Sequence, residues 1–135
     1  MVPGDLFDGK LAIQTEVNLI QIGPVAIATV PGELYPELWL AKPGGGSYVE
    51  APAGGDYPDA PAEAPLQSLL PSGSVPVIIN NGNDALGYIL PMSQWDEDAP
   101  YAYGETEEPQ YGEQNSLGAE MAGTIASEFG AMVTQ

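Results

Sequence analysis

Two short apolar runs predict the main strands of this chain. Residues 25–30 are almost entirely apolar, and a run of that length is typical of a strand that is buried on both faces. Residues 75–80 repeat this pattern. Residues 17–22 are also strand-like, and the Gly23-Pro24 pair that follows them signals a turn. We therefore expect a hairpin over residues 16–30 and a second buried strand over residues 75–80.

A four-residue periodicity near the end of the chain predicts its longest helix. The apolar stripe of this helix consists of Leu117, Met121, Ile125 and Phe129. Asn115 or Ser116 stands just ahead of it and suits an N-cap. We also expect a short helix over residues 33–41, which Pro36 interrupts, and another over residues 66–70.

Two segments lack any such periodicity. Residues 42–65 are rich in Gly, Pro and Ala and poor in large apolar side chains, which predicts a long surface insertion loop. Residues 96–113 form an acidic run that contains three tyrosines. Clustered carboxylates attract Ca²⁺, but this run lacks the ligand spacing of an EF-hand. A solvated acidic loop is therefore favoured over a calcium site.

The order of these elements predicts an α/β or α+β fold, with a few-stranded mixed sheet, flanking helices and the long Gly- and Pro-rich loop. The length of 135 residues suits one domain or part of one. Because the strands are few for a free-standing sheet, we expect them to complete a larger sheet to which another segment contributes.

The chain is strongly acidic. Nineteen Asp and Glu residues stand against two lysines and no arginine, so the formal net charge is −17. That charge repels phosphate backbones and anionic lipid surfaces, which argues against nucleic-acid binding and against membrane binding through a basic patch. No apolar run approaches the roughly 20 residues of a transmembrane helix, and the first residues lack the pattern of a signal peptide.

Histidine and cysteine are both absent. Disulfides, thiol catalysis and sulfur-ligated metal sites are therefore excluded, and so is a Ser-His-Asp triad within the chain. A hydrolase that uses paired carboxylates stays open, with Glu33 and Asp84 as the two acids.

Glu33 is the first candidate functional residue. It follows the apolar run 25–30 directly after Pro31-Gly32. Catalytic groups in α/β proteins often lie just beyond a strand end, and rigid neighbours there favour a metal ligand. The alternative is that Glu33 opens the next helix and interacts favourably with the helix dipole.

Tyr88 is the second candidate. It follows the apolar run 75–80 after a stretch of Asn, Gly and Asp residues that tolerate left-handed conformations. A tyrosine in this place can turn back toward a cleft, where its phenol ligates a metal or donates a hydrogen bond to a developing oxyanion. The alternative is a half-buried tyrosine whose hydroxyl is satisfied within the fold.

Taken together, these motifs resemble a known family. The matching stretches are Ile22-Gly23, Val30-Pro31-Gly32-Glu33, Asn83-Asp84-Ala85-Leu86-Gly87-Tyr88-Ile89-Leu90-Pro91 and Tyr111-Gly112-Glu113-Gln114-Asn115-Ser116. Their order over residues 16–133 resembles the C-terminal part of the catalytic domain of neutral ceramidases and their bacterial relatives. The Gly- and Pro-rich loop is the part that matches least.

The resemblance implies a zinc amidase that cleaves an N-acyl sphingoid amide. In that family, Zn²⁺ is held by two histidines from the N-terminal part and by a glutamate and a tyrosine that correspond to Glu33 and Tyr88. Tyr111 corresponds to a second tyrosine, near the reacting carbonyl. The histidines and the family's serine belong to an N-terminal segment without a counterpart here. Two oxygen ligands alone should hold zinc weakly.

Three functions therefore stay open. The first is the C-terminal portion or subunit of a ceramidase-like zinc amidohydrolase, which is inactive until a histidine-bearing partner segment completes it. The second is a non-catalytic structural protein, such as a coat or filament subunit, that self-associates on the same scaffold. The third is an acidic module that binds Ca²⁺ or other divalent cations. The first two favour an extracellular or periplasmic location.

Overall fold

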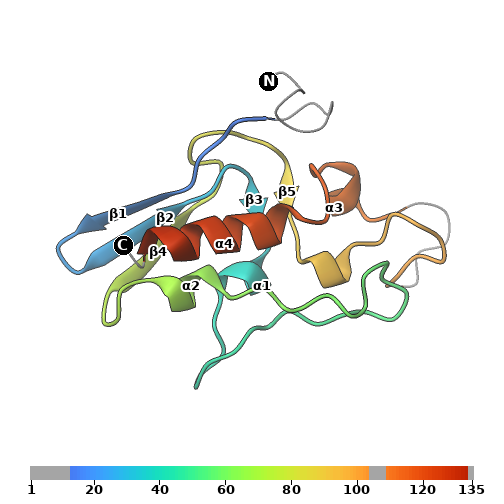
Figure 1. The fold of residues 1–135 in the computed structure, drawn as a ribbon, viewed down its shortest axis with the longest axis horizontal. Helices are drawn as coiled ribbons and strands as arrows, with labels where there is room; N and C mark the ends of the chain where they lie inside the picture. Colours follow the sequence, from blue (N-terminus) through green and yellow to red (C-terminus); the bar gives the residue numbers. More distant parts are fainter. Residues whose placement is uncertain (1–12, 104–108, 134–135) are drawn as a thin grey trace.

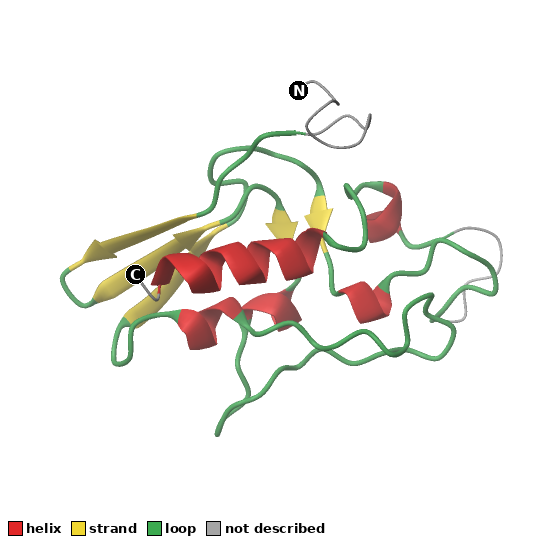
Figure 2. Cartoon of the chain, in the orientation of Figure 1, coloured by secondary structure: helices red, strands yellow, loops and turns green. Residues whose placement is uncertain are grey.

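The computed structural model describes residues 13–103 and 109–133 of the chain. A small sheet forms one layer, and the helices α2 and α4 lie across one face of it (Figure 1; Figure 2). The predicted fold class, a few-stranded mixed sheet with flanking helices, is confirmed.

The main sheet has three strands in the order β1-β2-β4. Strands β1 (Asn18–Ile22) and β2 (Val25–Thr29) form the expected antiparallel hairpin, and Gly23 takes a left-handed φ of 56° in its turn. Strand β4 (Val75–Ile79) pairs with β2 in parallel. The carboxyl ends of β2 and β4 consequently lie at the same edge of the sheet.

A second, two-stranded parallel sheet follows those strand ends. It consists of β3 (Glu33–Leu34) and β5 (Tyr88–Ile89), which lie side by side near the start of α4 in Figure 1. Each of its strands comes a few residues after a strand of the main sheet, so the two sheets continue one another along the chain.

The helices are short except for the last. Their bounds are α1 Pro36–Trp39, α2 Leu66–Leu69, the 3-10 helix η2 Met92–Gln94, α3 Tyr111–Gln114 and α4 Met121–Val133. Between α1 and α2, residues 42–65 form a loop with one isolated bridge from Ala41 to Ser47, as the composition predicts. In the described ranges, no helix has the length and apolarity that crossing a membrane requires.

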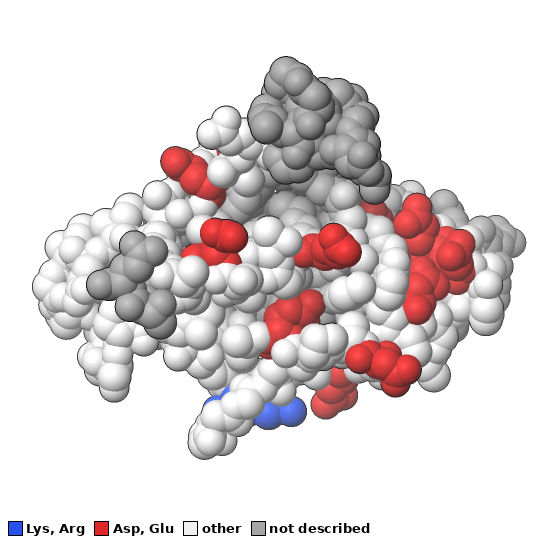
Figure 3. All heavy atoms as spheres, viewed as in Figure 1, with Lys and Arg blue, Asp and Glu red and all other residues white. Residues whose placement is uncertain are grey.

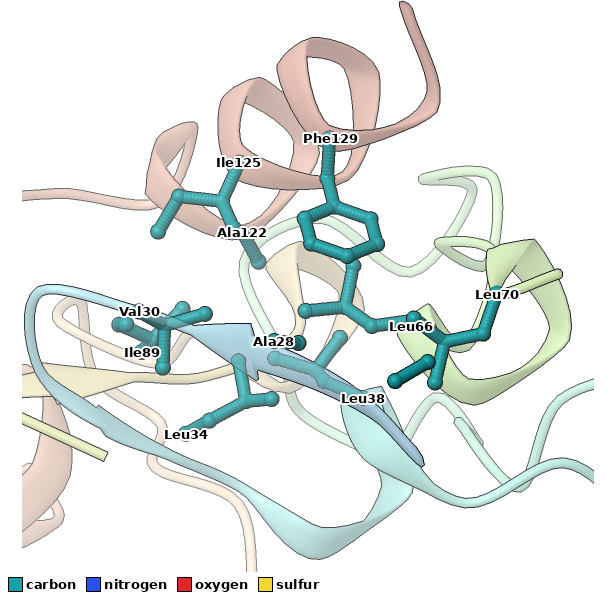
Figure 4. Packing of buried hydrophobic residues seen from close by; sticks show 11 residues of the cluster. Ala28, Val30, Leu34, Leu38, Leu66, Leu70, Ile89, Ala122, Ile125 and Phe129 are labelled. Atoms are coloured by element: carbon teal, nitrogen blue, oxygen red, sulfur yellow. The ribbon is translucent and has the colours of Figure 1, made fainter. Parts of the chain in front are cut away.

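One continuous core lies between the main sheet and α4. Phe129, Ile125 and Ala122 point from α4 toward the sheet, where they share one core cluster with Ala28 of β2 (Figure 4). Around them lie the other members of the cluster: Val30, Leu34, Leu38, Leu66, Leu70 and Ile89. The helix that the four-residue apolar periodicity predicts is therefore present, and it begins at Met121.

Two helix boundaries differ from the sequence prediction. Glu33 lies in strand β3 and does not open a helix, while Pro36 is the first residue of α1 and does not interrupt it. The last helix begins at Met121, so Asn115 and Ser116 are not its N-cap. Gly118 has a φ of 138°, which is incompatible with a helix.

The predicted burial of two strands on both faces is wrong. In β2 the inward Ala26 and Ala28 are fully buried, whereas Val25 and Ile27 on the other face are only half-buried, and β4 is mostly exposed. The second sheet face, opposite α4, is formed by alternate residues of the three strands. It carries the aliphatic residues Ile20, Ile22, Val25, Ile27, Val75, Val77 and Ile79, with the polar pair Asn18 and Thr29 beside Ile79. We call this the outer face. An apolar run alone does not tell whether another layer packs on the second face of the strand that it forms.

The acidic run 96–113 is only partly the solvated loop that we expect. Acidic side chains are spread over the α4 side of the molecule (Figure 3). Asp96 is nevertheless fully buried, and its Oδ2 accepts a hydrogen bond from the Ala102 N–H at 2.7 Å. Glu113, at the start of α3, is also buried. Residues 104–108 of the run lie outside the described residues.

Candidate functional site

The structure brings Glu33 and Tyr88 together. They are direct partners in the register of the β3–β5 pair. Leu34 and Ile89, the next residues of the two strands, belong to the core under α4. Because successive side chains of a strand point to opposite faces, Glu33 and Tyr88 both point away from that core.

Close backbone contacts fix this pair. The Glu33 N–H donates to the Gly87 carbonyl at 2.8 Å, and the Tyr88 N–H donates to the Asn115 carbonyl at 2.9 Å. A Cβ atom at Gly32 would collide with the Gly87 carbonyl, and one at Gly87, whose φ is 89°, would collide with Asn115. Glycine is therefore required at both positions beside the candidate site.

Tyr111 joins the pair from the first position of α3. Its ring lies edge-on to the Tyr88 ring, with 5.6 Å between the ring centroids and an angle of 75° between the planes. Tyr35 packs on Tyr88 in the same way, at 6.2 Å and 81°. Tyr111 is 69 % exposed and Glu33 is also exposed, whereas Tyr88 between them is half-buried.

The charge of Glu33 controls the ionisation of Tyr88. The negative carboxylate raises the pKa of the Tyr88 phenol above 10, and desolvation and the hydrogen bond between the two side chains act in the same direction. At neutral pH the phenol therefore stays protonated and donates a hydrogen bond to the carboxylate. A cation between the two oxygens would reverse this effect, since it would stabilise the phenolate.

Sequence reasoning missed the supporting residues behind this pair. Burial, followed by the charge of Glu113, raises the pKa of Tyr35 to about 12. A Cβ at Gly112 would collide with the Tyr35 hydroxyl, so α3 packs directly on that tyrosine. The spacing of Glu33 and Tyr35, two residues apart at a strand, is a signal that could have pointed to Tyr35. Nothing in the sequence pattern marks Glu113 as buried.

Asp84 has a different role from Glu33. Its Oδ2 accepts a hydrogen bond from the Thr15 Oγ1 at 2.7 Å, which ties the loop after β4 to the segment before β1. The charges that raise the pKa of Tyr88 come from Glu33 and Tyr111. The paired-carboxylate alternative of Glu33 with Asp84 thus stays a prediction.

A hollow beside α4 lies apart from the candidate site. A pocket of about 640 Å³ opens between residues 61–64 and the first half of α4, and Met92 and Leu69 also line it. Glu33, Tyr88 and Tyr111 do not line this pocket. The candidate site is therefore a surface pair and not part of that hollow.

The donor set that the structure assembles is one carboxylate and one phenol. Within residues 13–103 and 109–133, no group of three or more His, Cys, Asp or Glu side chains could hold a metal ion. Catalytic zinc usually has three protein ligands, of which these two residues could supply part. Comparisons with family models, with curated proteins and with solved structures found no match for this chain.

Proposed function

We propose that this chain supplies the C-terminal part of a ceramidase-like zinc amidohydrolase, acting on an N-acyl amide, and that a histidine-bearing polypeptide completes the site. The observation that carries the proposal is the direct register pairing of Glu33 with Tyr88, with the Tyr111 ring against Tyr88. Residues that are 55 and 23 positions apart in sequence thereby meet at one place on the surface, which supports the proposal.

In this proposal Glu33 and Tyr88 would hold Zn²⁺ together with two partner histidines. Zinc, when bound, acidifies water and polarises a carbonyl group. The register pairing of β3 with β5 places Glu33 and Tyr88 beside each other for this role. Tyr111 is placed beside them as a hydrogen-bond donor to the amide carbonyl oxygen as negative charge develops on it.

The metal-binding half of the proposal can be tested on the chain alone, with imidazole in place of the missing histidines. Zn²⁺ plus imidazole at pH 8 should produce the ultraviolet difference spectrum of a tyrosine phenolate, because the metal lowers the pKa of Tyr88. Glu33→Gln should raise the zinc concentration that gives half of this spectral change by at least about tenfold, since it removes a direct ligand. Tyr88→Phe should abolish it.

Matched control variants test whether the zinc-dependent spectrum comes from Glu33 and Tyr88. Glu50→Gln and Tyr57→Phe remove an acid and a tyrosine from the 42–65 loop and should leave the zinc-dependent spectrum unchanged. A spectrum that is absent in the unsubstituted chain, or equally strong in Glu33→Gln, would show that this pair is not a zinc site.

The catalytic half needs the protein purified from its source together with any bound polypeptide. We expect stoichiometric zinc, a histidine-containing partner and hydrolysis of a fluorescent N-acyl sphingoid amide. Tyr111→Phe should lower kcat about 10²- to 10³-fold with unchanged zinc content, because it removes one donor to the developing oxyanion. Protein that has neither zinc nor such a partner would contradict the proposal.

A second candidate function is a non-catalytic assembly subunit. The apolar outer face favours it, because five of the side chains on that face are between 37 % and 64 % exposed. Such a subunit would form oligomers or filaments of this chain alone, which sedimentation over a range of protein concentrations would detect.

A further inference from the structure

The outer face of the sheet has the composition of a core. Seven aliphatic side chains lie in adjacent rows. The register places Ile22, Val25 and Val75 in one row and Ile20, Ile27 and Val77 in the next, and the last row holds Ile79 beside the polar Asn18 and Thr29. No charged residue of these strands interrupts the face. Ile22 is 64 % exposed and Val75 is 54 % exposed.

Such a face is unusual for a sheet that stays in water. Strands of half-exposed sheets normally alternate apolar and polar side chains, and parallel pairs such as β2–β4 are usually covered on both faces. Here the covered face carries Ala26 and Ala28 of β2 beside Leu19 and Ile78, whereas most of the Ile and Val side chains of the three strands point outward. A contiguous apolar surface of this kind marks a protein–protein contact.

We propose that the outer face is the docking surface of the histidine-bearing polypeptide, which covers it with an apolar layer of its own. This choice of occupant rests on the proposed function. The same polypeptide reaches the site by continuing past the carboxyl ends of β2 and β4, because β3 and β5 follow those ends and Glu33 and Tyr88 also point away from the α4 core.

Charge argues for this occupant over a second copy of the chain. Two copies would bring two net charges of −17 together, and that repulsion opposes association. The partner is therefore neutral or basic around its apolar layer. Its association rate should fall as salt rises, while its dissociation rate changes little.

A photocrosslinking experiment in the source organism identifies the occupant. p-Benzoylphenylalanine is placed at Val75 and, as a matched control, at Leu117, which is also 54 % exposed but lies ahead of α4. We expect a crosslink to a distinct polypeptide from position 75 only. Crosslinks to a second copy of this chain, or equal yields from both positions, would overturn the proposal.

Binding of the purified partner then tests the surface itself. Ile22→Gln and Val75→Gln should weaken binding by about tenfold or more each, because each removes one buried aliphatic side chain from the interface. Leu117→Gln should change binding less than about twofold, and all three variants should unfold at the same temperature as the unsubstituted chain. Equal affinities for all variants would overturn the proposal.

The two proposals fail separately. A partner that docks through Val75 but contains no histidine would overturn the proposed function and its choice of occupant, and would leave the docking surface established. A histidine-bearing partner whose binding is insensitive to Ile22→Gln and Val75→Gln would overturn the docking surface alone.

Discussion

The two faces of the main sheet are built from the same strands and have opposite surroundings. On the face toward α4, Ala26 and Ala28 of β2 are fully buried in one core cluster with Ile125 and Phe129 of α4. The outer face carries larger aliphatic side chains and remains exposed within the described chain. Hydrophobicity is therefore not what separates the faces.

The two faces of the sheet differ in whether another element packs on them. The inner face has such an element because α4 presents an apolar stripe at helical spacing, and this stripe fits over Ala26 and Ala28. The candidate site follows the same division. Tyr35 packs partly against the core, whereas Tyr88 points away from it beside Glu33.

The largest expected effect is on the covered face. Phe129→Ala should lower the free energy of unfolding by about 3–5 kcal/mol, because it opens a cavity at a fully buried position between α4 and the sheet. Urea unfolding followed by circular dichroism measures this change. A loss below about 1 kcal/mol would mean that α4 does not cover the sheet as described.

One substitution made on both faces sharpens the contrast. Val30→Thr places a hydroxyl in the core and should cost about 1–3 kcal/mol, because Val30 is fully buried. Val77→Thr makes the same change on the outer face and should cost less than about 0.5 kcal/mol in the isolated chain. The two variants should differ in their urea midpoints and share one denaturant slope. Equal costs would mean that the outer face is also covered.

Alkaline pH separates the two tyrosine environments. The pKa of Tyr35 is about 12 in the folded chain, against 10.0 as its ordinary value. Its contribution to stability is therefore complete below pH 10 and is lost as pH rises toward 12, because the unfolded chain ionises first. Tyr35→Phe should make the fall of stability between pH 10 and 12 shallower, as measured by urea unfolding at several pH values.

Tyr57→Phe is the control for that experiment, because it removes an exposed tyrosine of the 42–65 loop. An equally shallow fall in both variants would show that burial of Tyr35 is not the cause.

The sequence predicts the positions of the strands well, because apolar runs and turn residues are local signals. It also anticipates that Glu33 and Tyr88 lie close together, since both follow a strand and strand ends of a parallel pair share an edge. What it misses is non-local. The exposure of β4 depends on the absence of a covering layer among the described residues, and a continuous apolar run reads the same with or without one.

Burial of acids is the other feature that the sequence conceals. An acidic run predicts a solvated loop, yet Asp96 is buried because its carboxylate accepts the Ala102 N–H. The start of α4 is missed for a local reason. The apolar spacing extends back to Leu117, but the positive φ of Gly118 separates Leu117 from the helix.

The smallest expected effect lies at the exposed pair itself. Glu33→Gln removes the charge that raises the pKa of Tyr88, so that pKa should fall toward 10. Nuclear magnetic resonance of ring-labelled tyrosines measures the pKa of Tyr88. The signal of Tyr88 is identified as the one that is missing from the spectrum of Tyr88→Phe. The shift should also shrink in 1 M salt, because this pair is exposed to screening. Glu37→Gln is the matched control, since the charge of Glu37 acts on Tyr35 and Tyr103. If both variants move the pKa of Tyr88 equally, the pairing of Glu33 with Tyr88 is not what sets it, and the contrast between the covered and the open side of the fold does not extend to this site.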